Sequence, residues 1–324
     1  MGLAIIAVII GLAILVWSAD TFIDGTTSLA VRFNMPSFLI GVIILGIGTS
    51  APELVVSALA ALSGSPDIAL GNAYGSNIIN ITLVLGVTAL ISPIIIRSDV
   101  IRYDLMLLIA VTALAAIQLH DGNLSLMDGI VLIMALVSVL LIQIFLSLRS
   151  NKDKVELPEE LAAKQEVNVL KSFGALILGL SLLIASSRAI VWGAGAVELA
   201  TLWGMSELLI GLTIVAIGTS LPELVASVAA ARRGEHDMAL GNVIGSNLFN
   251  TLGVVGLAAI IKPIQNIDPQ IVSRDMLMVG LVTVLLFILA IIAFRRQGEM
   301  KHGSGVVLIL TFIFYSVWLA KSAI

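Results

Sequence analysis

Long apolar runs separated by short polar segments constrain the fold of this chain more than any other sequence feature. A helix that crosses a bilayer needs about 20 predominantly apolar residues. Of the 324 residues, 59% are hydrophobic and only 12% are charged, whereas soluble domains are about a quarter charged. We therefore expect an all-α membrane protein with ten transmembrane helices. The predicted spans are residues 3–28, 36–62, 68–92, 104–120, 126–148, 172–198, 206–231, 238–262, 274–294 and 304–322.

The longest polar stretch, residues 149–171, divides the chain into two halves of five spans each, residues 1–148 and 172–324. If this stretch is a cytoplasmic loop, only four of the 17 Lys and Arg residues fall on the outer side, which leaves 13 on the cytoplasmic side. Such a bias is what the positive-inside rule requires. The sequence therefore predicts a multi-pass protein of the cell (plasma) membrane with both termini outside. The four outer basic residues are Arg188, Lys262, Arg274 and Lys321.

The two halves contain an internal repeat without gaps. Residues 41–94 align with residues 211–264 at a constant offset of 170, with 29 identities in 54 positions. The core reads GIGTSAPELVVS (46–57) against AIGTSLPELVAS (216–227), then DIALGNAYGSNIIN (67–80) against DMALGNVIGSNLFN (237–250). Because each half has an odd number of spans, the second copy is inserted upside down. Inverted repeats are a transporter architecture whose site lies at the repeat interface near the midplane.

A proline interrupts the second span of each half. Pro52 has no N–H, so the carbonyl of Gly48, four residues earlier, loses its helical partner. Pro222 and Gly218 repeat this arrangement. The sequence predicts a kinked or discontinuous helix whose freed carbonyls are available to a ligand. Because bare backbone is costly in lipid, these carbonyls are expected to face protein or a wet cavity.

Each half also places one glutamate, Glu53 or Glu223, in the middle of an apolar span. A carboxylate at mid-bilayer costs at least about 2.5 kcal/mol, and neither repeat has a basic residue at that depth. A bound cation is the simplest compensation. Polar residues four positions before and four positions after each glutamate lie on the same helix face as the glutamate. On the following span, three further polar residues spaced at i, i+4 and i+8 share one face. They are Thr49, Ser57, Asn72, Ser76 and Asn80 in the first half and Thr219, Ser227, Asn242, Ser246 and Asn250 in the second.

The donors on these faces are all hard oxygens, and Ca²⁺ takes about 6–8 such ligands in a flexible shell. The chain has no cysteine, and its three histidines, His120, His236 and His302, fall in predicted loops. Thiolate or imidazole sites for zinc or copper are therefore not expected.

Other small and polar residues of the repeat have simpler interpretations. Gly41, Gly71 and Gly86 are expected to permit close helix packing. For Asn72 and Asn242, a helix-bridging role and a ligand role remain equally open. Asn77 and Asn247 lie one residue off the predicted ligand face, so packing is expected for them.

The paired motifs GTSAPE (48–53) with GSNIIN (75–80), and GTSLPE (218–223) with GSNLFN (245–250), resemble the two alpha repeats of the sodium/calcium exchangers in the calcium:cation antiporter superfamily. The resemblance covers the whole ten-span layout. It implies that the second, third, seventh and eighth helices surround the ions, and that the long first and sixth helices slide across this bundle. It also implies that Asn80 and Asn250 line the centre of a site whose Ca²⁺ and Na⁺ ligands are Glu53, Glu223, Thr49, Ser50, Thr219, Ser220, Ser76 and Ser246.

This chain departs from the family pattern at one point. Several family members place an acidic residue at the position of Asn80 or Asn250, whereas both are Asn here. A site with two carboxylates suits one Ca²⁺ by charge, leaves the Na⁺ stoichiometry open and argues against K⁺ co-transport. Because the 149–171 loop is too short for the calcium-sensing domains of animal exchangers, the resemblance implies a prokaryotic-type exchanger.

The sequence and the resemblance together predict a secondary antiporter that exchanges Na⁺ for Ca²⁺ by alternating access at a shared midplane site. A proton-coupled Ca²⁺ or cation antiporter is the alternative, because a buried glutamate can carry H⁺ instead. A channel is a hypothesis of a different class, and a membrane enzyme lacks any visible nucleophile–base set. No cofactor, no nucleic acid and no obligatory protein partner is expected; the partners are the lipid bilayer and the transported ions.

Asp20 and Arg188 occupy equivalent points of the first and sixth spans when Gly11 is aligned with Gly179. They either form an ion pair where the two halves meet, or each side chain extends separately to a membrane interface. The sequence leaves both alternatives open.

Overall fold

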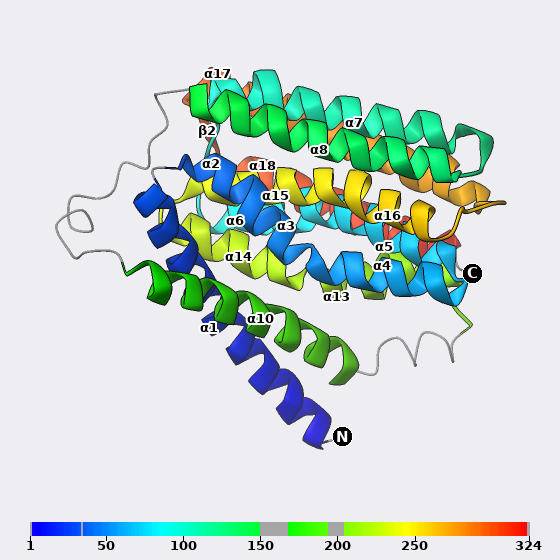
Figure 1. Cartoon of the computed structure of the whole chain (residues 1–324), viewed down its shortest axis with the longest axis horizontal. Helices are drawn as coiled ribbons and strands as arrows, with labels where there is room; N and C mark the ends of the chain where they lie inside the picture. The colour runs from blue at the N-terminus through cyan, green and yellow to red at the C-terminus, as the bar shows by residue number, and fades with distance from the viewer. Residues whose placement is uncertain (1, 34, 150–167, 194–203, 323–324) are drawn as a thin grey trace.

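The structure is a computed structural model that describes residues 2–33, 35–149, 168–193 and 204–322. Within these residues the chain is a bundle of helices (Figure 1), so the predicted all-α fold is confirmed. Eight of the described helices are long and apolar enough to cross a membrane, or nine if one bent pair forms a single span. The number of ten spans stays a prediction.

The first half begins with the long helix α1 (Gly2–Phe33). The predicted second to fifth spans follow as short α-helical pieces joined by wider π turns (η), except for α8, which is continuous. Their bounds are α2 (Ser37–Ile40), η1 (Gly41–Leu45), α3 (Gly46–Thr49), α4 (Ala51–Ser63), α5 (Pro66–Ile79), η2 (Asn80–Val84), α6 (Leu85–Ile91), η3 (Val100–Asp104), α7 (Leu105–Gln118), the 3₁₀ turn η4 (Leu119–Asp121) and α8 (Leu126–Arg149).

The second half repeats this pattern, with π turns at positions offset by the same 170 residues: η5 matches η1, and η6 matches η2. Since π turns are rare, their recurrence at equivalent positions shows that the two halves repeat each other in structure as well as in sequence. The bounds are α10 (Val169–Gly193), α12 (Glu207–Ile210), η5 (Gly211–Val215), α13 (Ala216–Thr219), α14 (Leu221–Arg232), α15 (His236–Phe249), η6 (Asn250–Val254), α16 (Val255–Ile261), η7 (Ile271–Met276), α17 (Leu277–Arg296) and α18 (His302–Ser322). The two-residue strands β1 (Ile94–Ile95) and β2 (Glu299–Met300) pair antiparallel.

The helices are arranged in layers (Figure 1). α1 and α10 lie side by side on one face of the bundle, and α7, α8 and α17 cover the opposite face. Between them run the proline-containing spans and the spans that follow them, from both halves. The repeated motifs therefore occupy the middle of the protein.

Glycines set the spacing between these central helices. A methyl group added to Gly41 would lie 2.4 Å from the carbonyl oxygen of Met238, and one on Gly245 would lie 2.5 Å from that of Val42. A methyl group on Gly71 would lie 2.9 Å from the oxygen of Leu208. The packing role predicted for Gly41 and Gly71 is thus confirmed, and backbones of opposite halves touch directly, as small residues permit in membrane bundles.

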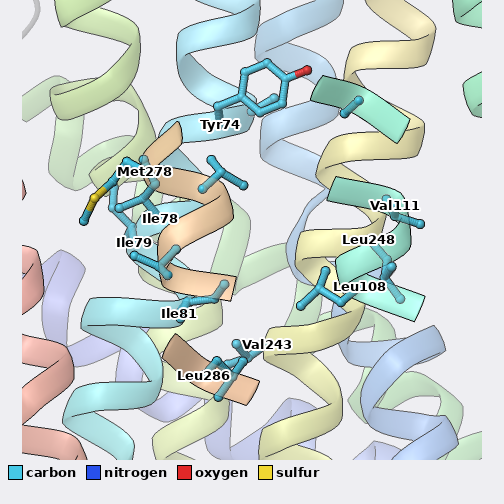
Figure 2. Close-up of a cluster of buried hydrophobic side chains, with 14 of the residues drawn as sticks. Tyr74, Ile78, Ile79, Ile81, Leu108, Val111, Val243, Leu248, Met278 and Leu286 are labelled. Carbon is cyan, nitrogen blue, oxygen red and sulfur yellow. The ribbon is translucent and has the colours of Figure 1, made fainter. Parts of the chain in front are cut away.

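The central helices pack against the outer layer through an apolar cluster (Figure 2). On α5 the cluster includes Tyr74 and Ile78, and it continues to Leu108 of α7, Leu248 of α15 and Leu286 of α17. In lipid such contacts stabilise by close packing rather than by exclusion of water. Because one face of α5 and α15 is filled in this way, their polar faces are directed into the bundle.

The proposed pairing of Asp20 with Arg188 is wrong. Antiparallel packing places Gly25 of α1 against Leu176 of α10, and Gly179 against Phe22. This register puts Arg188 beside residue 13, about 10 Å along the helix from Asp20. Among the described residues Arg188 has no ion pair, whereas Arg233, just after α14, pairs with Asp20 at 3.3 Å and also with Asp24. The sequence alignment showed that Asp20 and Arg188 occupy equivalent positions in their two spans. In antiparallel helices, equivalent positions do not lie next to each other.

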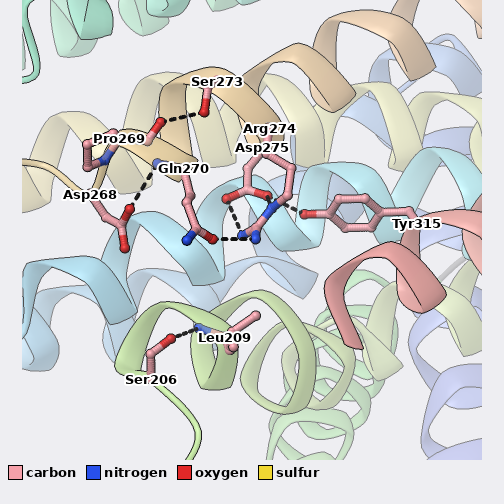
Figure 3. A network of polar contacts seen from close by, with 9 residues as sticks. All are labelled: Ser206, Leu209, Asp268, Pro269, Gln270, Ser273, Arg274, Asp275 and Tyr315. Carbon is pink, nitrogen blue, oxygen red and sulfur yellow. Dashed lines mark hydrogen bonds and ion pairs between the residues drawn. The ribbon is translucent and has the colours of Figure 1, made fainter. Parts of the chain in front are cut away.

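A buried polar network ties η7 to α18 (Figure 3). Arg274 donates two hydrogen bonds to Asp275, at 2.7 and 3.0 Å, and the hydroxyl of Tyr315 donates to the same carboxylate at 2.9 Å. All three residues are at most 5% exposed. Since a buried charge is tolerated only with partners, this network holds the last helix against the ninth predicted span.

Tyr315→Phe removes one hydrogen bond to a buried carboxylate and is expected to lower the free energy of unfolding by about 1–3 kcal/mol. Thermal unfolding of the purified protein in detergent measures the change. Tyr103→Phe is the matched control, because Tyr103 is 54% exposed and surface changes are usually within about 0.5 kcal/mol. Equal shifts in the two variants would contradict a stabilising role for the network.

Candidate cation site

The second span of each repeat breaks where the sequence predicts. α3 ends at Thr49 and α4 begins at Ala51, with a bend of 41° between the two helical pieces. In the second repeat α13 ends at Thr219 and α14 begins at Leu221. Pro52 lies in the first turn of its helix, where a missing N–H costs nothing. The predicted discontinuity of the helix is therefore confirmed.

Glu53 and Glu223 each occupy the first turn of the new helix, α4 or α14. Both are completely buried, at 0% exposure. The positive end of a helix dipole favours a carboxylate at this position. The break in each span thus places an acidic group inside the bundle, with its charge at a helix N-terminus rather than in lipid.

The two glutamates belong to one cluster because their hydrogen bonds cross between the repeats. Ser50 donates to Glu223 Oε1 at 3.0 Å, and Ser220 donates to Glu53 Oε1 at 3.4 Å. Each serine precedes the glutamate of its own repeat by three residues, so the two helix breaks face each other. Ser76 of α5 also lies 3.5 Å from Glu53 Oε1, a distance at the weak limit of a hydrogen bond.

Asn72 is a bridge between the halves. Its amide nitrogen donates to the Glu53 carbonyl at 3.2 Å and to Ser57 at 3.0 Å, and its amide oxygen accepts a hydrogen bond from Thr219 at 3.1 Å. With both ends of the amide in use, the geometry favours the bridging alternative over the ligand alternative.

Asn242 forms the mirror-related set. It donates to the Glu223 carbonyl at 3.3 Å and to Ser227 at 2.8 Å, and it accepts from Thr49 at 3.2 Å. The two threonines therefore link the helix break of one repeat to the following span of the other. The sequence places all these residues on helix faces but does not indicate that their hydrogen bonds run from one repeat to the other.

A double-mutant cycle on Asn72→Ala and Thr219→Val is expected to give a coupling of about 0.5–3 kcal/mol in unfolding free energy, because each change removes the other's partner. The comparison cycle pairs Asn72→Ala with Thr82→Val. Thr82 donates only to Ile78 of its own span and lies about 15 Å along the helix, so additivity is expected there. An Asn72–Thr219 coupling near zero would contradict the bridge between the repeats.

Several buried atoms around the glutamates have no hydrogen-bond partner within the described part of the chain. They are Oε2 of Glu53 and of Glu223, and both amide atoms of Asn80 and of Asn250. Asn80 and Asn250 are 0% exposed and begin the π turns η2 and η6, which pack against α14 and α4 respectively. Unpaired buried polar atoms are rare in proteins. Their symmetric occurrence marks a place with oxygen donors for a hard cation such as Ca²⁺.

Every residue predicted for the site is buried at the helix breaks or on the span that follows. Among the members not yet described, Ser246 donates to the carbonyl of Gly46 at 3.3 Å. Thr49, Ser50, Ser76 and Ser246 are 0% exposed, Ser220 is 2% exposed and Thr219 is 8% exposed. The structure thus gathers the ten predicted residues in the centre of the bundle.

One of the freed carbonyls faces protein, as the cost of bare backbone in lipid predicts. The carbonyl of Gly218, freed by Pro222, accepts a hydrogen bond from Ser187 of α10 at 2.6 Å. Sequence reasoning missed Ser187, since no repeat or motif marks it. The contact joins α10 to the helix break of the second repeat.

Charge in the site comes from the two glutamates. In the portion of the chain that the structure describes, no group of three or more His, Cys, Asp or Glu residues is placed to hold a metal ion. The histidines lie away from the glutamates, although at helix ends rather than in loops: His120 in η4, His236 at the start of α15 and His302 at the start of α18. The donor set therefore consists of two carboxylates, hydroxyls and amides.

Comparison with known proteins places this arrangement in a family. Residues 3–145 and 171–321 match the family described as sodium/calcium exchanger protein. The chain is 42% identical to the putative antiporter CaxA of Alkalimonas amylolytica over 99% of this chain and 100% of that protein. It is 41% identical to the inner membrane protein YrbG of Escherichia coli (strain K12), covering 99% and 97% of the two chains.

A solved structure agrees with these relatives. The sodium-calcium exchanger NCX_Mj, studied in Na⁺ and Ca²⁺ soaks, superposes with a TM-score of 0.79 at 30% identity, covering 97% of this chain and 98% of that chain. The sequence, the fold and the inverted repeat all indicate the same family. This protein is therefore a membrane transporter of the sodium/calcium exchanger family and not an enzyme.

Proposed function

We propose that this protein exchanges Na⁺ for Ca²⁺ by alternating access at a single site between Glu53 and Glu223. Membership of the family makes it a cation antiporter. The observation that supports this site is the mirror-related pair of buried carboxylates, each with one oxygen that has no hydrogen-bond partner among the described residues. Ionised groups without a counter-charge are costly in a membrane, and a cation held between them would remove that cost.

The proposed ligands are the oxygens that surround the two carboxylates. Glu53 and Glu223 supply the negative charge, and the hydroxyls and amides complete a shell of neutral oxygens that suits Ca²⁺ and Na⁺. When a cation is bound, the neighbouring atoms that now form hydrogen bonds with the carboxylates would either ligate the cation or orient the carboxylates. The neutral members are Thr49, Ser50, Ser76, Asn80, Thr219, Ser220, Ser246 and Asn250.

Exchange follows from competition for this shared charge. A Ca²⁺ ion and Na⁺ ions need the same carboxylate oxygens, so binding of one displaces the other. An empty site would carry two uncompensated charges, and their transfer through the low-dielectric interior is unfavourable. The site therefore changes access when loaded, which suppresses leak.

We propose the topology in the same terms. The protein lies in the cell membrane with its termini outside, and the 149–171 loop is cytoplasmic between two inverted halves, residues 1–148 and 172–324. The distribution of Lys and Arg supports this orientation, and the relative YrbG is described as an inner membrane protein.

The test is Ca²⁺ uptake into proteoliposomes loaded with Na⁺ and diluted into Na⁺-free buffer. Uptake that requires internal Na⁺ is the expected result. Uptake driven by a pH gradient with Na⁺ absent would instead identify H⁺ as the coupling ion, the alternative that the sequence leaves open. Ca²⁺ flux with neither gradient, accompanied by single-channel currents, would overturn antiport.

A further inference from the structure

We propose that Asp104 and Gln143 form a proton-binding site where η3 meets α8. In this site a protonated carboxyl group and a side-chain amide hold each other by two hydrogen bonds. The two residues belong to the outer layer of helices, on the face of the bundle opposite α1 and α10 (Figure 1). The site is independent of which cations the protein exchanges between its glutamates.

The two halves of the protein place an aspartate at the same point of their fourth spans. Asp104 is the fifth residue of the π turn η3, and Asp275 is the fifth residue of the π turn η7. Each aspartate is reached by a side chain from the last helix of its own half, which is Gln143 of α8 or Tyr315 of α18. The two carboxyl groups therefore have comparable surroundings, and their differences are informative.

Compensation of the charge is the main difference between them. Asp275 receives two hydrogen bonds from the guanidinium group of Arg274 (Figure 3), which neutralises its charge. Tyr103 stands at the position of that arginine in the first half, and it is 54% exposed. Within the described part of the chain, Asp104 forms no ion pair and accepts one hydrogen bond, from the amide nitrogen of Gln143 at 3.2 Å. An ionised carboxylate of this kind is costly in a membrane protein.

Charges on the neighbouring elements do not replace the missing arginine. Arg97 and Asp99 both act on Asp104, with opposite signs, and they pair with each other at 3.6 Å. Arg97 also pairs with Asp237 of α15 at 3.1 Å. η3 and α17, which pack together, carry further titratable groups that are all exposed, and described α7 has none. The exposed groups are Arg102, Tyr103, Arg295 and Arg296.

Gln143 shows where a proton would bind. It is 6% exposed, and its amide oxygen has no hydrogen-bond donor among the described residues. An ionised carboxylate can only accept hydrogen bonds, whereas a protonated one also donates. A proton on Oδ2 of Asp104 would let that oxygen donate to Gln143 Oε1 while Oδ1 still accepts from Nε2. One proton thus removes the charge of Asp104 and satisfies a buried oxygen of Gln143 that otherwise costs free energy.

The bound proton strengthens the contact between η3 and α8. Two hydrogen bonds join them when the site is loaded, whereas one hydrogen bond and an uncompensated charge remain when the proton leaves. Stabilisation by the proton is therefore present at low pH and is lost as the pH rises. In the proposed topology η3 lies at the cytoplasmic end of its span, so cytoplasmic pH controls the packing of this corner.

Infrared difference spectra of the purified protein in detergent, taken between acidic and alkaline buffers, test the proposal because they report protonated carboxyl groups. We expect wild type to show a band that Asp104→Asn lacks. Asp121→Asn is the matched control and is expected to keep the band, because Asp121 is exposed at the other end of α7, in η4. Bands from Glu53 and Glu223 would be common to all these proteins.

Asp104→Asn also supplies a second measurement. The new amide can form both hydrogen bonds with Gln143 without a proton, so the variant is expected to fold. The midpoint temperature of its thermal unfolding is expected to fall less with rising pH than that of wild type or Asp121→Asn.

Gln143→Leu decides the matter if Asp104→Asn fails to fold. It keeps the carboxyl group but removes the amide, so the band is expected to move to higher frequency as the hydrogen bonds are lost. Identical difference spectra of wild type and Asp104→Asn would show that Asp104 binds no proton and would overturn the proposal. An unshifted band in Gln143→Leu would overturn it as well, because the proton would not be shared with the amide.

Discussion

Glu53→Gln and Glu223→Gln are each expected to abolish Na⁺-driven Ca²⁺ uptake while leaving the protein folded. Each change removes half of the site's charge but keeps the size of a side chain that is completely buried. Loss of one partner from a buried charge interaction costs about 2–5 kcal/mol, which is a fall in affinity of roughly 30-fold to several-thousand-fold. Initial uptake rates into Na⁺-loaded proteoliposomes measure the effect.

Glu299→Gln is the matched control for these variants. It makes the same chemical change at a partly exposed residue that pairs with Lys301 near the surface, so uptake close to wild type is expected. Gel filtration in detergent shows whether each variant is folded. Wild-type uptake in either Glu53→Gln or Glu223→Gln would remove that residue from the transport site.

Gly245→Ala is expected to cause a large loss of stability. The added methyl group would lie 2.5 Å from the carbonyl oxygen of Val42 and 2.7 Å from its Cα. Backbone cannot rotate away as a side chain can, so η1 and α15 must separate. Overpacking costs about 1–3 kcal/mol or more, and here the upper end is expected, together with reduced uptake because α15 carries Asn242 and Ser246.

Gly280→Ala is the control for this prediction. A methyl group on Gly280, in α17, meets nothing within 4 Å, and replacement of glycine by alanine in a helix favours folding by about 0.5–1 kcal/mol. The midpoint temperature of thermal unfolding in detergent is therefore expected to fall for Gly245→Ala, and to stay the same or rise for Gly280→Ala. A similar stability of the two variants would show that the close approach of η1 and α15 is not required.

The sequence predicted the fold and the helix faces that carry the candidate site residues, because both depend on local features. Apolar runs fix the helices, Pro52 and Pro222 fix the breaks, and the repeat identifies equivalent positions without any structure. Helical spacing was enough to place Ser76 and Asn80 on one face. These features depend on neighbours within a few residues.

Contacts between the halves were not predictable in this way. The bonds from Ser50 to Glu223 and from Thr219 to Asn72 join residues 173 and 147 positions apart, and their pairing depends on how the inverted copies pack. The same limit explains why Ser187 was missed and why the sequence could not decide between the two alternatives for Asp20 and Arg188. Equivalence under the repeat predicts similar surroundings, but only three-dimensional register decides which side chains meet.

The central claim is that one carboxylate from each inverted half binds the same cation. A crystal structure of the protein soaked with Ca²⁺ or Sr²⁺, examined by anomalous scattering, tests it most directly. The account predicts one strong peak within about 2.3–2.6 Å of carboxylate oxygens from both Glu53 and Glu223. Peaks that contact only one glutamate, or that lie outside the helix breaks, would contradict it.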